Sequence, residues 1–352
     1  MTHAHLAALE KGRYIPRFDD MLSLSAVLNV PLYHFEDKLK LDMISTASPT
    51  ETRNWEELMK LGRETMQTGN YDGALQFYRS AQTLAESESG RNGRWAESKL
   101  FVANCIRRMG LLRIAKDELE ELFTCTRLDA ALKVRAKMVM GDMYRYQKNN
   151  EFARLILEDA YRQSRGLQNP LIAGKVSNSL ANLYADLGRF DEAVNLYREA
   201  LKSFGAVNDS RAVIISEIAL GQCLAEMDGI EGSFEAVHII ESALRKAEKE
   251  GFRREVALAC TTLAKISFQS GDYEASVSYA DEARKIAQEE EFPEVLFQNL
   301  FYLWKIARRQ KKTRLESLYF KRLCYIGKKI ETVTPELEEF NHLRTAGKRV
   351  KR

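Results

Sequence analysis

Asn178 and Asn182 are the residues whose type and spacing most clearly suggest a binding function. They lie four residues apart, so on a helix their amides point from the same face. Each amide offers N–H donors and a carbonyl acceptor, which are the groups that hold the backbone of an extended peptide. The pair therefore predicts a surface that binds a peptide or a segment of a partner protein.

Residues that could carry out a reaction are not gathered in this way. The five histidines are scattered along the chain, and no metalloprotease, nucleophile-elbow, P-loop or dinucleotide-binding motif is present. Many acidic residues lie four residues from a Lys or Arg, which is typical of a solvated helix face. We expect no catalytic residues, no metal, no cofactor and no enzymatic activity.

Composition limits the remaining classes of function. The net charge of +3 is too small for nucleic-acid binding by overall charge alone. The sequence has neither an apolar run long enough to span a bilayer nor a leader, which predicts a cytoplasmic protein without a membrane partner. The five cysteines have no metal-ligand or C-x-x-C spacing, and we interpret them as reduced, buried thiols.

The elements that must position the asparagines repeat along the chain. A small residue recurs along the chain at separations of 41, 38, 40, 40 and 43 residues, as Gly62, Ala103, Gly141, Ala181, Gly221 and Ala264. Trp304 occupies the equivalent position 40 residues after Ala264. A second row follows: Ala74, Ala115, Ala153, Ala193, Ala236 and Ser276. A third lies seven residues further on: Ala81, Leu122, Ala160, Ala200, Ala243 and Ala283. Antiparallel helices approach closely only where side chains are small, so these rows predict stacked helix pairs.

Residues 179–201 resemble the tetratricopeptide repeat (TPR) consensus. The matching residues are Leu180-Ala181, Tyr184, Gly188, Phe190, Ala193, Tyr197 and Ala200, and a second unit matches at Leu61-Gly62, Gly69, Tyr71, Ala74, Tyr78 and Ala81. The period near 40 exceeds the TPR length of about 34 residues, but the signals of HEAT repeats, which have the longer period, are absent. The resemblance implies an all-α, right-handed TPR-like superhelical solenoid of about seven helix pairs.

In TPR arrays the first helix of each pair lines a concave groove. By that resemblance the residue after each small residue faces the groove: Arg63, Asn104, Asp142, Asn182, Gln222, Lys265 and Lys305. Asn178 belongs to the neighbouring position four residues earlier. We expect these eight residues to bind the peptide or partner segment, although any outward helix face is usually polar.

Residues 2–35 resemble the later part of a Cro-repressor-like (Xre-family) helix-turn-helix domain. The matching features are Leu9-Glu10-Lys11-Gly12, Pro16, the apolar residues Phe18, Met21, Leu22, Leu24 and Leu28, and Asn29-Val30-Pro31-Leu32 with Phe35. The resemblance makes the stretch from Thr2 the recognition helix. It implies DNA contacts from Thr2, His3, His5, Lys11 and Arg13.

Two further helices precede the recognition helix in that family, whereas this chain begins at Met1. Three interpretations stay open: a longer reading frame that supplies them, a truncated relative that no longer binds DNA, and a cap on the solenoid. The expected organisation is a partial helix-turn-helix segment over 1–44, a linker over 45–54, the TPR solenoid over 55–330 and a C-terminal tail over 331–352.

The resemblance to helix-turn-helix plus TPR regulators of bacteria implies a transcriptional regulator that senses a peptide or protein in its groove, and several such regulators dimerise. The alternative is a TPR scaffold or adaptor without DNA binding.

Residues 305–329 form a basic stretch that these functions leave unexplained. It contains ten Lys and Arg residues against one acid, Glu316, with Tyr319, Phe320 and Tyr325 among them. A solvated outer face on the last repeat is the simpler interpretation. A surface for nucleic acid or for an acidic partner is the alternative.

Overall fold

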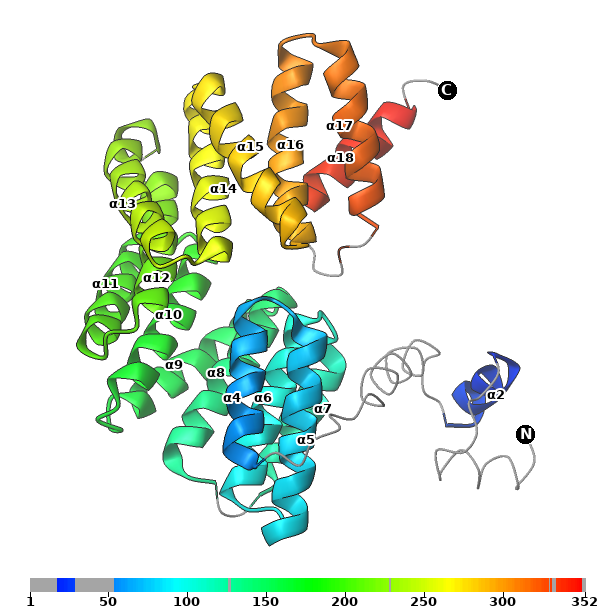
Figure 1. The fold of residues 1–352 in the computed structure, drawn as a ribbon, viewed down its shortest axis with the longest axis vertical. Helices are drawn as coiled ribbons and strands as arrows, with labels where there is room; N and C mark the ends of the chain where they lie inside the picture. The colour runs from blue at the N-terminus through cyan, green and yellow to red at the C-terminus, as the bar shows by residue number, and fades with distance from the viewer. Residues whose placement is uncertain are drawn as a thin grey trace. The chain divides into compact units, whose positions relative to one another are not determined.

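The chain folds into α-helices that belong to two units, Met1–Arg127 and Leu128–Arg352 (Figure 1). The computed structural model describes residues 18–28, 54–125, 128–227, 229–328, 330 and 334–349, and every regular element in these ranges is an α-helix. Unit 1 contains α2 (Phe18–Leu28), α4 (Trp55–Gln67), α5 (Tyr71–Ser89), α6 (Gly93–Arg108) and α7 (Leu112–Phe123). Unit 2 contains α8 (Ala130–Tyr146), α9 (Asn150–Ser164), α10 (Pro170–Asp186), α11 (Phe190–Ala206), α12 (Ser210–Met227), α13 (Gly229–Lys249), α14 (Arg253–Ser270), α15 (Tyr273–Glu289), α16 (Pro293–Arg309), α17 (Thr313–Ile326) and α18 (Pro335–Arg349).

Asparagine and aspartate side chains define many of the helix starts. Asn169, for example, accepts a hydrogen bond from the Ile172 backbone N–H at 3.2 Å, and Pro170 occupies the first turn of α10. Such caps satisfy backbone donors that have no partner inside the helix. A side-chain cap of the same kind begins six other described helices, at Asn54, Asn70, Asn92, Asp129, Asp209 and Asp272.

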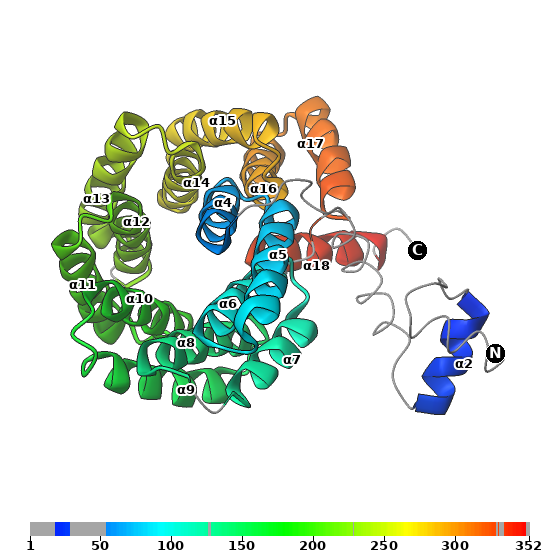
Figure 2. The same ribbon diagram turned by 60° about the horizontal axis from the view of Figure 1, so that its bottom comes forward.

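Consecutive helices pack as antiparallel pairs, and the pairs stack on one another. The described residues form seven such pairs, α4/α5 and α6/α7 in unit 1 and α8/α9 to α16/α17 in unit 2. Within unit 2, α8, α10, α12, α14 and α16 lie on the inner side of the curve and their partners on the outer side (Figure 2). The predicted all-α TPR-like arrangement of helix pairs is confirmed.

The small residues lie at the helix crossings, as their spacing predicts. A Cβ atom added to Gly62 would lie 2.5 Å from the ring of Tyr78, and one added to Gly221 would lie 2.5 Å from Ile240. The alanines of the second and third rows are fully buried. Ser276 replaces alanine in the second row because its hydroxyl donates to the Ala264 carbonyl at 2.8 Å, which satisfies the buried oxygen.

The last pair is built on aromatic residues instead. Trp304 is buried and its ring lies 5.6 Å from that of Phe340 in an edge-to-face contact. Phe340 belongs to α18, within the segment assigned to a tail by the sequence. Residues 335–349 of that segment are instead helical and pack against α16, because Leu337 and Phe340 are buried there. The spacing rows do not extend this far and gave no signal for α18.

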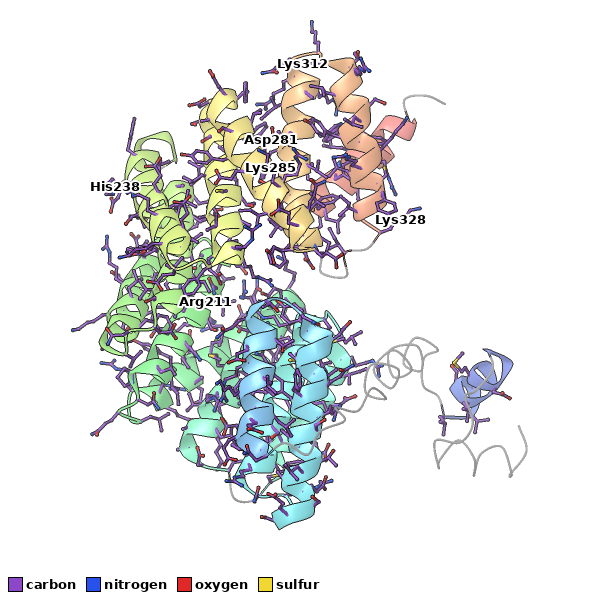
Figure 3. All side chains as sticks on the ribbon, in the orientation of Figure 1. Arg211, His238, Asp281, Lys285, Lys312 and Lys328 are labelled. Carbon is purple, nitrogen blue, oxygen red and sulfur yellow. The ribbon has the colours of Figure 1, made fainter. Side chains whose placement is uncertain are left out.

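Figure 3 draws the described side chains and labels polar residues of unit 2, namely Arg211, His238, Asp281, Lys285, Lys312 and Lys328. His238 of α13 and Lys285 of α15 are exposed, and Lys312 and Lys328 flank the two ends of α17. No described helix has the length and apolar character needed to cross a membrane.

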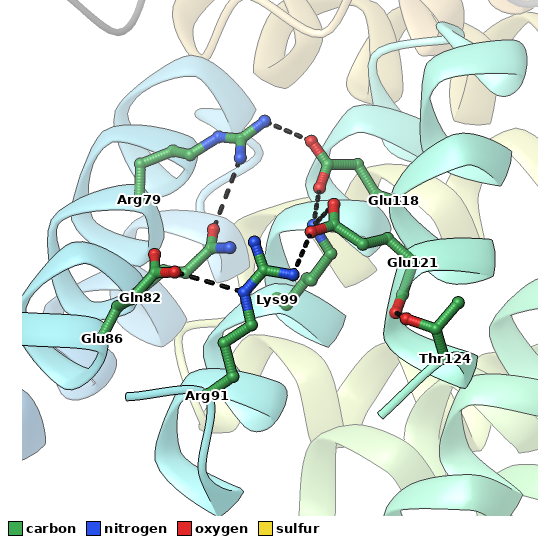
Figure 4. A network of polar contacts seen from close by, with 8 residues as sticks. All are labelled: Arg79, Gln82, Glu86, Arg91, Lys99, Glu118, Glu121 and Thr124. Carbon is green, nitrogen blue, oxygen red and sulfur yellow. Dashed lines mark hydrogen bonds and ion pairs between the residues drawn. The ribbon is translucent and has the colours of Figure 1, made fainter. Parts of the chain in front are cut away.

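A buried ion network ties three helices of unit 1 together (Figure 4). The Lys99 ammonium of α6 is 2% exposed and lies 2.6 Å from a carboxylate oxygen of both Glu118 and Glu121 on α7. Arg79 of α5 donates to the second oxygen of Glu118. Burial raises the pKa of Glu118, but Arg79 and Lys99 outweigh it and leave the pKa below its usual range. Each buried charge is therefore matched by opposite charges.

All five cysteines are free thiols, and they differ in access to solvent. Cys105, Cys223 and Cys260 are buried, whereas Cys125 in unit 1 and Cys324 in unit 2 are half-buried. Burial raises the pKa of Cys105 to about 12 and that of Cys223 to about 11, so these thiols stay protonated at neutral pH.

Candidate functional site

One face of α10 carries the two asparagines singled out by the sequence. Lys175, Asn178, Asn182 and Asp186 are spaced by three, four and four residues, which places them along one stripe of the helix. Because α10 lies on the inner side of unit 2, we call this stripe and its equivalents on α8, α12, α14 and α16 the inner face. Asn178 and Asn182 are both half-buried there.

Neighbouring hydroxyl groups hold both asparagine side chains in a defined orientation. The Tyr197 hydroxyl of α11 donates to Asn182 Oδ1 at 2.7 Å, and the Ser216 hydroxyl of α12 donates to Asn178 Oδ1 at 3.0 Å. In the described part of the chain, neither Nδ2 group has a hydrogen-bond acceptor. The two carbonyl oxygens are thus used internally, while two N–H₂ groups remain as donors for a ligand.

The other predicted groove residues of unit 2 mostly connect neighbouring repeats. Asp142 accepts from Ser179 at 3.3 Å, Lys265 donates to Glu226 at 2.8 Å, and Lys305 donates to Glu339 at 2.8 Å. Gln222 also donates to Glu226, at 3.2 Å. The Gln222 contact lies within α12, whereas the other three link α8 to α10, α12 to α14 and α16 to α18. The row therefore has a structural role besides any binding role.

Two predicted groove residues belong to unit 1. Arg63 of α4 is exposed, and Asn104 of α6 accepts hydrogen bonds from the guanidinium of Arg107 at 2.8 and 3.2 Å. The other six predicted residues therefore all lie on unit 2, whereas these two lie on unit 1.

A further row on the inner face escaped the sequence analysis. It lies six residues before each small residue and reads Arg135, Lys175, Ile215 and Leu258 in α8, α10, α12 and α14. Ile215 and Leu258 are each 36% exposed, so both present apolar surface to solvent. The constant offset from the small residues is the signal that could have found them.

Lys175 is the cation beside the asparagine pair. Its side chain is exposed, and among the described residues no carboxylate lies within ion-pair distance of it. Surrounding protein atoms lower the pKa of its ammonium, Arg135 lowers it further, and Asp209 opposes both. The inner face around α10 to α14 thus combines two oriented amide donors, a cation and two exposed aliphatic side chains.

The predicted DNA-contacting residues Thr2, His3, His5, Lys11 and Arg13 lie outside the described residues. Of that segment the structure describes α2, in which Leu24 is buried and Val27 is 82% exposed.

Comparison with known proteins agrees with the helix-pair architecture. A tetratricopeptide repeat family model matches residues 177–207, which cover most of α10 and α11. No curated protein is significantly similar in sequence.

Several solved structures share the fold at low sequence identity. The Rap conjugation gene regulator of plasmid pLS20, in complex with the Phr* peptide, is 13% identical with a TM-score of 0.63, covering 91% of this chain and 92% of that one. A Rap protein complexed with competence and sporulation factor is 17% identical with a TM-score of 0.61, covering 86% and 77%. Bacillus thuringiensis PlcR, in complex with the peptide PapR7 and DNA, is 14% identical with a TM-score of 0.52, covering 72% and 89%.

Proposed function

We propose that this chain is a cytoplasmic regulator whose inner face on unit 2 binds a peptide. The observation that carries the proposal is the pair of N–H₂ groups of Asn178 and Asn182, which are oriented by Tyr197 and Ser216 and have no acceptor in the described part of the chain. The names of the pLS20 Rap structure and of the PlcR structure record bound peptides in proteins of the same fold, which supports the same class of ligand.

The chemistry of the inner face defines the peptide. Its backbone carbonyls accept from Asn178 and Asn182, because both amides present donors. One or two apolar side chains cover Ile215 and Leu258, which removes their exposed surface from water. An acidic side chain or the terminal carboxylate lies beside Lys175.

Binding would act on DNA through the N-terminal segment. The peptide favours one of two arrangements of the repeats or of a homodimer, and this shifts the population that places Thr2, His3, His5, Lys11 and Arg13 on their half-sites. The name of the PlcR structure records both a peptide and DNA in one complex, which supports a regulator that binds both. A scaffold without DNA binding is the competing function.

The test of peptide binding uses the best binder from an immobilised library of short peptides. Calorimetry should show that Asn178→Ala with Asn182→Ala weakens it by roughly 10- to 100-fold, since each lost hydrogen bond contributes about 1 kcal/mol. Asn195→Ala is the matched control, because Asn195 is exposed on α11 of the same helix pair. Unchanged affinity in the double variant would remove the pair from the site.

DNA binding is tested separately on the promoter region of the protein's own gene. A mobility shift that weakens in Lys11→Ala with Arg13→Ala and responds to the peptide supports a regulator. No shift with or without the peptide, while the peptide still binds, supports the scaffold.

A further inference from the structure

Helix α17 buries fewer side chains than the other outer helices of unit 2. It buries only Leu323 and Ile326, whereas α11 buries Ala193, Val194, Tyr197, Ala200 and Phe204. Leu315, Leu318 and Tyr325 of α17 are 39%, 46% and 64% exposed. These three residues are spaced by three and seven positions, so they form one apolar face along the helix.

A cavity of about 750 Å³ opens beside this face, between the end of α15, the start of α16 and α17. Its apolar lining includes Leu296, Leu300, Leu318, Tyr325 and Ile326. This volume lies within the range of cavities that hold apolar ligand groups. The cavity is separate from the asparagine pair and from Ile215 and Leu258, because none of its lining residues belongs to α10, α12 or α14.

The segment that contains α17 is strongly positive. Residues 311–328 contain six cations, Lys311, Lys312, Arg314, Lys321, Arg322 and Lys328, against the single acid Glu316. Glu316 pairs with Arg308 of α16 at 3.9 Å, and none of the six cations forms an ion pair with another described residue. Lys321 and Arg322 line the cavity itself, with Glu291 on the α15 side.

We propose that this cleft docks an acidic amphipathic helix of a partner protein. Apolar side chains spaced by three and four residues would enter the cavity and contact Leu318 and Tyr325. Acidic residues along the α17 side would pair with Lys321 and Arg322, while Glu291 disfavours acidic residues on the α15 side. A partner helix of about four turns matches the 14 residues of α17.

A pair of designed peptides tests the proposal on the full chain. Both are fluorescein-labelled helices of about 16 residues with the same leucine stripe, and their polar positions carry Glu in one and Lys in the other. Fluorescence anisotropy should show binding of the Glu peptide and at least about tenfold weaker binding of the Lys peptide. Leu318→Ser and Lys321→Glu should each weaken the Glu peptide by about tenfold.

Two controls separate the cleft from general hydrophobicity and general charge. Leu155→Ser removes a leucine that is 57% exposed on α9, and Lys202→Glu makes the same charge change on the exposed surface of α11. Both controls should bind the Glu peptide like the wild type. Circular dichroism of all four variants checks that the helices are retained.

Three results would overturn the proposal. The first is no binding of the Glu peptide up to about 1 mM, or equal binding of both peptides. The second is wild-type affinity in Leu318→Ser and Lys321→Glu. The third is tight binding of a short DNA duplex that Lys321→Glu abolishes and Leu318→Ser leaves unchanged, which would assign the basic surface to nucleic acid.

Discussion

At the scale of single residues, the inner face depends on hydroxyl groups that touch no ligand. Tyr197 is 2% exposed, yet its hydroxyl fixes which end of the Asn182 amide faces solvent. An asparagine alone can present either its oxygen or its N–H₂ group. A buried tyrosine in the second helix of the pair therefore selects the donor function of a residue in the first helix.

Tyr197→Phe tests this selection. The variant keeps the ring and removes the donor to Asn182 Oδ1, so the free energy of unfolding should fall by about 1 kcal/mol and the peptide should bind several-fold more weakly. Urea unfolding and calorimetry measure the two effects. Tyr279→Phe is the control, because it removes a hydroxyl that donates to Glu241 at 3.1 Å away from the asparagine pair. Peptide affinity should change only in Tyr197→Phe.

The Lys99 network predicts acid sensitivity in unit 1. The folded state lowers the pKa of Glu118, so its contribution to stability is complete above the unfolded pKa and is lost as the pH falls through the folded pKa. The free energy of unfolding should therefore decline as the pH drops below about 5. Lys99→Met should cost roughly 3 kcal/mol at neutral pH, because it removes a partner of two carboxylates. An unfolding free energy that stays flat from pH 6 to pH 3 would contradict this account.

At the scale of helices, spacing in the sequence was sufficient to predict the pairs. Gly62, Gly141 and Gly221 lie at crossings where the partner side chain occupies the space of a Cβ atom, and that constraint is local enough to appear as a constant interval. The contacts between helix pairs also recur near the repeat length, since Tyr161–Glu199, Ser216–Asn178 and Tyr279–Glu241 each join residues 38 positions apart, but their residue types vary from repeat to repeat and gave no signal. The Lys305–Glu339 and Lys265–Glu226 contacts join residues 34 and 39 positions apart. They depend on the angle at which one helix pair packs against the next.

The candidate site was therefore predicted only in part. The sequence indicated the asparagine pair, because both residues lie on one helix. It did not indicate the orientation of their amides, which depends on Tyr197 and Ser216 in two other helices. The row containing Lys175, Ile215 and Leu258 was missed because only half of it is polar, and a polar pattern was the criterion.

Two glycine variants test the crossing at the helix scale. Gly221→Ala should destabilise the chain by roughly 1–3 kcal/mol, because the new Cβ would lie 2.5 Å from Ile240 and 3.0 Å from the Ala236 carbonyl oxygen. Gly205→Ala in α11 meets no atom within 4 Å and should stabilise it by roughly 0.5 kcal/mol. Denaturant unfolding monitored by circular dichroism distinguishes the two signs. A stabilising Gly221→Ala would show that α12 and α13 do not pack as described.

At the scale of the whole molecule, the division into two units allows peptide binding to unit 2 to be measured separately from its effect on unit 1. Hydrogen exchange followed by mass spectrometry should show slower exchange in α10, α12 and α14 when the peptide is saturating, because these helices form the inner face. Slower or faster exchange in α4 to α7 would report coupling to unit 1. Unchanged exchange in α10 and α12 would exclude the inner face as the binding surface, whatever happens in unit 1.

The uneven access of solvent to the thiols has a practical consequence for measuring that coupling. A maleimide dye or spin label should modify Cys125 and Cys324 first, because the other three sulfurs are enclosed in the helix stack. One of these two positions belongs to each unit, so the unmodified natural sequence already carries a donor site and an acceptor site for spectroscopic distance measurement. Ligand-driven rearrangement could thus be followed without introducing any cysteine.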